Sequence, residues 1–159
     1  MNVRKMALRA ARLGWVGGGI SFVFRHFSGV LPINKVYENA DVIAFFHPVP
    51  SCDPHILIIP KARMRTAFDF TDDRLRAVLC AGEAVAKRYE MPLQMRINGG
   101  CRQEVMQAHF HLTPASAVRG LQCVTTMEQA CTLAHGAMGF SFVFLMGKDG
   151  IWVDRTRTE

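Results

Sequence analysis

The alternation of apolar and polar positions along the first half of the chain predicts short strands followed by one long helix. Residues 35–38 are typical of a short strand, and the β-branched and aromatic run 42–46 predicts a buried one. Residues 55–59 have the same composition and end before a proline. From Thr71 on, apolar residues recur every three to four positions, which predicts a helix that covers a sheet with one face and ends near Pro92.

The middle of the chain predicts two further strands joined by a glycine-containing turn. Residues 93–97 alternate in part, and residues 107–112 alternate polar with apolar side chains before Pro114. Asn98-Gly99-Gly100 lies between them and is typical of a flexible turn.

The last forty or so residues predict a helix followed by a β-hairpin. Thr125 and Glu128 have the spacing of a capping box ahead of an apolar stripe. Apolar strands over residues 139–146 and 151–153 flank the turn Lys148-Asp149-Gly150. Together with the preceding elements, these predict an α+β domain with a mostly antiparallel sheet and one long covering helix.

Composition and charge narrow the class of protein. The chain has 159 residues, about the length of one domain, and half of them are apolar, which is enough for one core. The formal net charge is +6, and its excess lies within residues 1–37, which contain no acid. A basic end on a balanced body indicates an anionic surface or a targeting segment, so no nucleic-acid partner is expected.

Residues 1–28 predict a basic amphipathic helix, with one apolar face and the cations mostly on the other. The weakly polar run 13–24 is too short for a membrane span, which needs ~20 residues. A signal peptide lacks a clean cleavage site here, and a mitochondrial presequence would contain more serine. We expect a cytoplasmic protein whose N-terminal helix makes weak contact with a membrane surface, or packs on its own domain or a partner.

The five cysteines are odd in number, and no two are spaced as Cys-x-x-Cys. This pattern predicts reduced thiols in a reducing compartment rather than a disulfide framework. Each cysteine is interpreted as a small, buried apolar residue.

Two histidines on one predicted strand are the strongest candidates for chemistry. Alternate strand residues share a face, so Gln107, His109 and His111 are expected to point the same way. Imidazole is a good nucleophile and proton carrier near neutral pH. The alternatives are a face merely exposed to water, and a metal site completed by His55; the metal site lacks a cysteine pair or an obviously placed carboxylate.

Several short motifs occur in a fixed order along residues 28–114. They are Lys35-Val36-Tyr37-Glu38, Ala44-Phe45, Pro50, the run from His55 to Lys61, Asn98-Gly99-Gly100, Gln103-Glu104-Val105 and Gln107-x-His109-x-His111. In order and spacing they resemble the histidine-triad (HIT) proteins, most of all the branch of purine nucleoside phosphoramidases and related nucleotide hydrolases. The resemblance implies a HIT-like domain over residues 29–159, with a core of 29–114 and a C-terminal extension of 115–159.

The resemblance also implies a role for each matching residue. His109 is implied to be the nucleophile that attacks an α-phosphate and forms a nucleotidyl-histidine intermediate, with its ring oriented by a main-chain carbonyl. His111 and His55 are implied to contact the phosphate, and His111 the leaving group as well. No metal or other cofactor is needed for this chemistry. The implied nucleotide-binding groups are Asn98, Gln103 and the main-chain amide of Val105.

A homodimer is also implied, because the family pairs through the long helix and a sheet strand. Small residues on the predicted helix permit such close approach. These are Ala77, Ala81, Gly82 and Ala84.

Three single positions and one short segment depart from the family pattern. Gln107 replaces the first histidine of the triad and cannot titrate, although it can still hydrogen-bond a nucleotide. His47 stands where relatives often carry an acid against the ribose, and Glu104 where they tend to have Ser or Thr. Residues 21–24 replace a Cys-x-x-Cys, so the zinc site of those relatives is not possible.

These observations favour a hydrolase of a nucleoside phosphoramidate or related nucleotide ester, acting through His109. A nucleotidyltransferase of the same family is one alternative, but such relatives usually change the last histidine to Gln, and His111 is kept. The other alternative is a nucleotide-binding or scaffold module with little turnover, which Gln107 and His47 favour.

Overall fold

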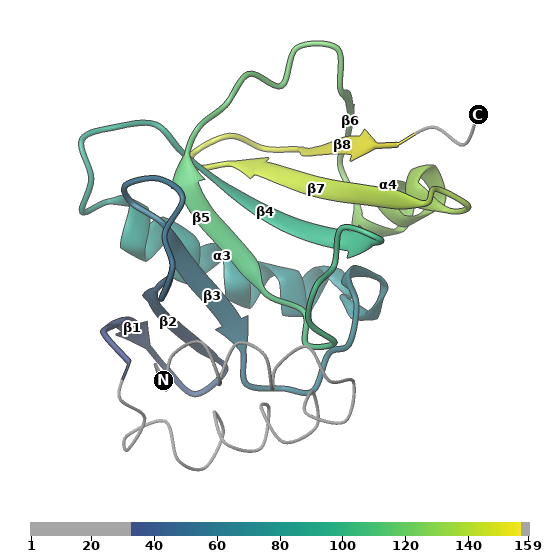
Figure 1. Ribbon diagram of the computed structural model, residues 1–159. Helices are drawn as coiled ribbons and strands as arrows, with labels where there is room; N and C mark the ends of the chain where they lie inside the picture. The colour runs from purple at the N-terminus through teal and green to yellow at the C-terminus, as the bar shows by residue number, and fades with distance from the viewer. Residues whose placement is uncertain (1–32, 157–159) are drawn as a thin grey trace.

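The computed structural model describes residues 33–156, so the expectations for residues 1–28 lie outside it. Within this part, one 3-10 helix and two α-helices accompany eight strands (Figure 1). The helices are η1 (Ala67–Asp69), α3 (Asp72–Ala86) and α4 (Met127–Ala134). The strands are β1 (Lys35–Glu38), β2 (Val42–Phe46), β3 (Ile56–Pro60), β4 (Leu93–Gly100), β5 (Phe110–Pro114), β6 (Gln122–Val124), β7 (Gly139–Leu145) and β8 (Ile151–Arg155).

The strands form one sheet in the order β1-β2-β3-β5-β4-β7-β8-β6, and every neighbouring pair is antiparallel. The predicted α+β fold with a mostly antiparallel sheet is therefore confirmed. α3 runs along the far face of the sheet in Figure 1. The described residues include no helix with both the length and the apolar character that crossing a membrane would require.

Both α3 and β3 deviate slightly from their predicted bounds. α3 begins after the N-cap Thr71, as predicted, but ends at Ala86 instead of near Pro92. The main-chain N–H groups of Arg88 and Tyr89 bond to carbonyls three residues back, so the chain tightens into turns there. β3 begins at Ile56, which leaves His55 in the connection from β2.

β4 is longer than the sequence predicts, and the predicted turn at Asn98-Gly99-Gly100 is wrong. These residues pair with β7, as far as Gly100 opposite Gly139. A β-carbon on Gly99 would lie 2.1 Å from Cζ of the Phe140 ring, so the glycine admits that ring rather than forming a turn. A partner strand far along the chain thus decides the local structure.

β5 begins at Phe110, so the predicted strand over residues 107–112 is wrong in its first three positions. Gln107 and Ala108 bond to the end of β3 and to the segment that follows it, instead of continuing a strand ladder. The main-chain N–H of Ala108 donates to the carbonyl of Met64 at 2.8 Å, and the Gln107 amide is bound to the same segment. His109 consequently lies just ahead of the strand that carries His111.

The C-terminal helix and hairpin are confirmed, and they extend the same sheet. β7 and β8 pair antiparallel, and β7 also pairs with β4. The cap of α4 is shifted by one residue: Thr126 and Gln129 form the capping box in place of Thr125 and Glu128. Gln129 takes the place of Glu128 in the capping box because its Oε1 accepts from the main-chain N–H groups of both Thr125 and Thr126.

One face of the sheet packs on a large apolar core, and the other face carries both polar and apolar side chains. The core lies between the sheet and the helices α3 and α4, where Phe110, Phe140 and Phe142 are fully buried. On the other face lie His111 and a small apolar cluster of Ile43, Phe45 and Ile59. The candidate site is therefore on the face away from the core.

The homodimer stays a prediction, and two of the four small residues of α3 serve packing within this chain. Ala81 and Gly82 are buried against the chain's own sheet. A β-carbon on Gly82 would lie 2.1 Å from Sδ of Met95, so this glycine allows α3 to approach β4. β4 is paired on both edges, and the open edges of the described sheet are β1 and β6. A strand of a second copy could therefore pair with the described sheet only at β1 or β6.

The five cysteines are free thiols, as predicted. The interpretation of each as a buried apolar residue is wrong, because Cys52, Cys80, Cys101 and Cys123 are exposed.

Candidate functional site

Four histidines from three neighbouring strands meet on the outer face of the sheet. His47 follows β2, His55 precedes β3, and His109 precedes β5, which carries His111. The ring centroids of His47 and His55 are 4.1 Å apart, those of His55 and His111 are 5.2 Å apart, and those of His109 and His111 are 4.9 Å apart. The structure thus brings together all three predicted catalytic histidines and His47.

His109 is held by its own chain. Its Nδ1 lies 2.8 Å from the main-chain carbonyl oxygen of Gln107. A carbonyl only accepts, so Nδ1 carries the proton and Nε2 keeps its lone pair. Burial lowers the pKa of His109, and the Gln107 carbonyl partly offsets this effect. The ring is neutral near pH 7 and presents an unprotonated nitrogen, as a nucleophile requires.

His55 and His111 form a directed pair. The main-chain N–H of Ser51 donates to Nδ1 of His55 at 3.2 Å, so the proton of the neutral His55 ring lies on Nε2. That nitrogen is 2.9 Å from Nδ1 of His111 and donates to it. The proton of the neutral His111 ring is therefore on its own Nε2, which makes this nitrogen a donor.

His47 carries its proton on the same ring nitrogen as His55 and His111. Its Nδ1 accepts from the main-chain N–H of Val49 at 3.1 Å, which leaves the proton on Nε2. Its ring stacks on that of His55 with an interplanar angle of 10°. The His47 main-chain N–H also donates to the carbonyl of His55 at 2.8 Å, so the loop between β2 and β3 is closed beneath the two rings.

All four pKa values are lowered, which keeps the rings neutral at physiological pH. Burial is the largest cause in each case. It lowers the pKa of His55 to about 4, with a further contribution from His47. It lowers the pKa of His111 to about 3, helped by the three neighbouring histidines and by Arg96, its cross-strand partner.

Ring nitrogens of His47, His55 and His111 lie within 4.8 Å of one another, which is compatible in distance with a metal site. The hydrogen bonds oppose that use. A metal at Nε2 of His47 or His55 needs a lone pair where their bonds to Val49 and Ser51 place a proton. The remaining ring, His111, turns its lone pair toward the His55 proton. The arrangement favours anion-facing N–H donors over metal ligands.

Three of the predicted nucleotide-binding groups lie on or after β4. Asn98 is on the same face as the histidines, and its Oδ1 accepts from the hydroxyl of Ser141 at 2.8 Å. The side-chain amide of Gln103 donates to the carbonyls of Arg65 and Val105, so it braces the loop before β5. The main-chain N–H of Val105 stays a predicted hydrogen-bond donor to the phosphate.

Gln107 is placed differently from the sequence-based expectation. Its side chain is 2% exposed and does not share a strand face with His109 and His111. Its Nε2 donates to the carbonyls of Pro60 and Ala62, each at 3.3 Å. The side chain connects the loop before β5 to the end of β3, and it is the main-chain carbonyl of Gln107 that contacts His109.

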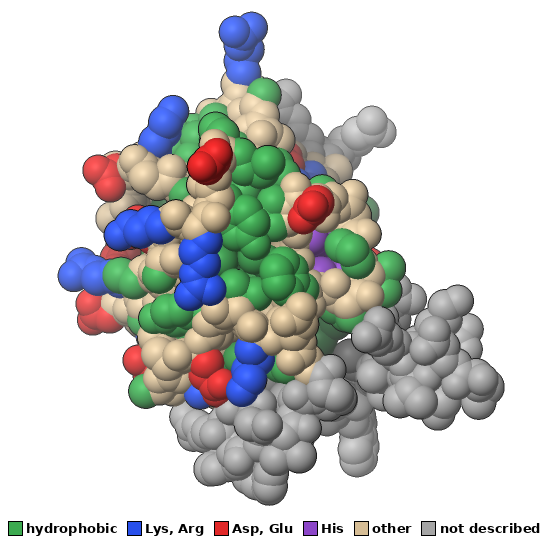
Figure 2. Space-filling model, turned by 90° about the vertical axis from the view of Figure 1, so that its left-hand side faces the viewer, with side chains coloured by type: hydrophobic (Ala, Val, Ile, Leu, Met, Phe, Trp, Pro, Cys, Tyr) green, Lys and Arg blue, Asp and Glu red, His purple; other side chains and the backbone are tan. Residues whose placement is uncertain are grey.

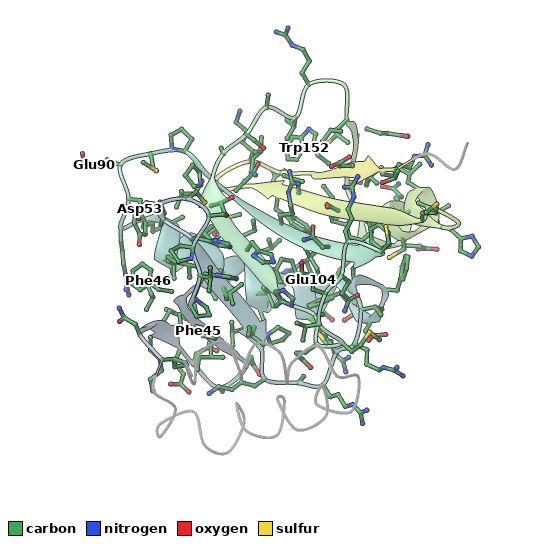
Figure 3. All side chains as sticks on the ribbon, viewed as in Figure 1. Phe45, Phe46, Asp53, Glu90, Glu104 and Trp152 are labelled. Atoms are coloured by element: carbon green, nitrogen blue, oxygen red, sulfur yellow. The ribbon has the colours of Figure 1, made fainter. Side chains whose placement is uncertain are left out.

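Glu104 supplies the negative charge that acts on the site. It lies near the start of β5 in Figure 3, and its charge raises the pKa of both His47 and His109 against the stronger effect of burial. Hydrophobic side chains gather beside the histidine visible in Figure 2. Phe46 and Val49, which flank the His47 position in the chain, are 40% and 59% exposed.

Sequence reasoning missed Ser51, Arg102 and Ser141. Ser51 sets the tautomer of His55 through its main-chain N–H, a contact that does not depend on side-chain type. Arg102 and Ser141 bond to each other across 39 positions of the chain. The alternation of β7 could have placed Ser141 on the polar face, but only the pairing with β4 identifies its partner.

Comparison with known proteins agrees with this geometry. Residues 28–118 match the HIT domain. Two curated relatives are each 31% identical over 55% of this chain: an uncharacterized 16.1 kDa HIT-like protein of Mycoplasma pneumoniae, of which 69% is matched, and Protein hit of Bacillus subtilis, of which 65% is matched. The chain thus spans about two thirds of the length of these relatives.

Solved structures show the same fold. A HIT family hydrolase from Legionella pneumophila Philadelphia 1 is 29% identical with a TM-score of 0.51, over 58% of this chain and 90% of that one. A second HIT-like protein, 22% identical with a TM-score of 0.53, covers 62% of this chain and 98% of its own. With more than half of its length matched by the HIT domain, this chain belongs to the HIT family.

Proposed function

We propose that this protein hydrolyses a nucleoside phosphoramidate or related nucleotide ester through a covalent intermediate on Nε2 of His109. The observation that carries the proposal is the 2.8 Å contact between Nδ1 of His109 and the Gln107 carbonyl. It leaves the other nitrogen of a neutral ring, Nε2, unprotonated and turned away from the Gln107 carbonyl. The Legionella relative, named a hydrolase, supports the same reaction class.

The proposed reaction has two displacements at phosphorus. First, Nε2 of His109 forms a bond to the α-phosphorus while the bond to the leaving amine or oxygen breaks, and the leaving group takes a proton from solvent. Second, water forms a bond to the same phosphorus, loses a proton to solvent, and the bond from phosphorus to His109 breaks. The products are a nucleoside monophosphate and the protonated leaving group.

The other side chains stabilise the charge on the phosphoryl oxygens. Nε2–H of His111 and the amide of Asn98 are donors for these oxygens. The hydrogen bond from Nε2 of His55 to Nδ1 of His111, 2.9 Å long, keeps the proton of His111 on its Nε2. Because the rings are neutral, these groups stabilise the anion as dipoles rather than as fixed positive charges.

The nucleoside part of the proposal rests on the surroundings of the site. Half-buried Leu57 is the cross-strand partner of His111, and it packs against the cluster of Ile43, Phe45 and Ile59. Such an apolar surface favours contact with the flat, apolar face of a nucleobase. His47 offers one N–H donor there, and a ribose hydroxyl can accept from it. This single hydrogen bond is less selective for ribose than the bond to a carboxylate would be.

The test is turnover of adenosine 5′-phosphoramidate by the wild-type chain and by His109→Ala. We expect hydrolysis to AMP that the substitution lowers by at least ~100-fold, the scale of losing a nucleophile. His135→Asn is the matched control, because His135 is exposed beyond α4. Equal turnover in His109→Ala and His135→Asn contradicts the proposal. No turnover in the wild type, with tight AMP binding, identifies a binding module instead.

A further inference from the structure

The C-terminal extension reaches the site through β7. Residues 119–156 lie outside the matched HIT domain. β7 pairs with β4 along its whole length, and Ser141 stands directly opposite Asn98. Cross-strand partners point to the same face, so the Ser141 hydroxyl lies on the histidine side of the sheet. The residue is fully buried, which protects its hydrogen bonds from water.

The donors around Ser141 fix the direction of each hydrogen bond. Nη1 of Arg102 lies 3.1 Å from the Ser141 oxygen, and a guanidinium only donates. The hydroxyl has one proton, and it goes to Oδ1 of Asn98 at 2.8 Å. The carbonyl end of the Asn98 amide is therefore engaged by Ser141, and the NH2 end points away from β7.

Arg102 is itself held by the end of β8. Its Nη1 lies 2.8 Å from Oδ2 of Asp154, and its Nη2 lies 3.1 Å from the hydroxyl of Thr156. The Arg102–Asp154 pair is about one third exposed, so we assign it a geometric role rather than a large stabilising one. The result is a chain of contacts, Asp154–Arg102–Ser141–Asn98, that starts in the extension and ends at the site.

We infer that Ser141 and Arg102 are positioning residues for Asn98, which hold its NH2 group toward a phosphoryl oxygen of the substrate. The inference rests on the proposed function for the identity of that substrate. A flipped amide would turn its oxygen toward the phosphate, where two acceptors repel each other. The extension is thereby a part of the site, although it contributes no reacting group.

The test is Ser141→Ala, with Ser116→Ala as a matched control. Ser116 also donates its hydroxyl to an amide oxygen of β4, that of Gln94, but at the end of the strand far from Asn98. We expect Ser141→Ala to lower kcat/KM about tenfold, the scale of one hydrogen bond, and Ser116→Ala to leave it within about twofold. Urea unfolding of both variants distinguishes a misoriented Asn98 amide from a loss of stability.

A double-mutant cycle distinguishes positioning from a general structural effect. In the Asn98→Ala background, Ser141→Ala should cause no further loss of kcat/KM, because there is no amide left to orient. Arg102→Met keeps the buried hydroxyl but frees its proton to turn, and should give a smaller loss of the same kind. Equal losses in Ser141→Ala and Ser116→Ala, or losses at Ser141 and Asn98 that multiply, overturn the inference.

A binding measurement keeps this inference separate from the proposed reaction. The side-chain NH2 resonances of Asn98, identified by their absence in Asn98→Ala, are followed during titration with AMP. We expect a shift in the wild type that weakens in Ser141→Ala. If these resonances do not respond in the wild type, the positioning inference is wrong. If they respond but the phosphoramidate is not hydrolysed, only the proposed reaction is wrong.

Discussion

The two strands that flank β4 contribute to the site in different ways. β5 carries His111 and follows directly on His109, so its side brings the ring nitrogens that would meet the substrate. β7 carries Ser141, whose hydroxyl contacts Arg102 and Asn98. Reacting groups and the groups that orient them therefore need not lie in the same part of the chain. The first kind has a motif, and the second is found only through its contacts.

After loss of the nucleophile itself, the largest effect is expected on the β5 side, from His111→Phe. This change keeps a ring but removes the Nε2–H donor and the acceptor for His55. We expect kcat for the phosphoramidate to fall about 100-fold, as when one donor to a developing oxyanion is lost. Steady-state kinetics measure it, with His135→Phe as the exposed control. A loss no greater than that of Ser141→Ala would erase the difference between the two sides.

The contact between β4 and β7 is tested by Gly99→Ala. The new β-carbon would lie 2.1 Å from Cζ of Phe140, a ring that also packs against Phe142. We expect the free energy of unfolding to fall by about 1–3 kcal/mol, since a buried ring must move. Urea unfolding measures it, and Phe140→Leu in the Gly99→Ala background should restore part of the loss. An unchanged midpoint would mean that β7 does not pack on β4 as closely as described.

Gln107 lies on the β5 side, but its side chain stabilises the fold. Gln107→Ala removes the amide that donates to the carbonyls of Pro60 and Ala62, yet it keeps the main-chain carbonyl that holds His109. We expect about 1–2 kcal/mol less stability and a kcat within a few-fold of wild type below the unfolding transition. Thermal unfolding and kinetics on the same sample check both. A loss of kcat as large as that of His111→Phe would assign the side chain to the reaction.

The smallest effect is on the pH dependence of stability. The pKa values of His55 and His111 are lowered to about 4 and about 3 in the folded chain, below the ordinary value of 6.5. Between these values the unfolded chain binds more protons, so the free energy of unfolding decreases as pH falls from about 6.5 toward 4. His55→Gln should make this slope shallower. Urea titrations at pH 7, 6 and 5 decide, and parallel slopes for the wild type and His55→Gln contradict the burial argument.

Much of the frame could be predicted from the sequence because it depends on local patterns. The apolar runs of β2 and β3, the N-cap Thr71 and the C-terminal hairpin are set by residues within a few positions of each other. The His-x-His spacing likewise predicted two neighbouring rings, whose centroids are 4.9 Å apart. Where two patterns overlap by one residue, as at the cap of α4, the sequence alone chose the wrong threonine, Thr125.

The remaining features depend on partners that are distant in the chain. The local sequence around Gly99 predicts a turn, but in the structure this glycine makes room for the ring of Phe140. The local pattern places Gln107 in a strand, but its side-chain amide bonds to carbonyls 45 and 47 positions earlier. The direction of the Asn98 amide is set by a hydroxyl 43 positions later. No local periodicity encodes such contacts, because they follow from strand order and register.

The most direct test of the central claim is to trap the intermediate. The wild-type protein is mixed with adenosine 5′-phosphoramidate and quenched rapidly at high pH, and its mass and peptide map are measured. We predict an AMP adduct on His109 that forms and decays at rates compatible with turnover, and that is missing from His109→Ala. Turnover with no adduct, or with the adduct on His111 or His55, would contradict the account.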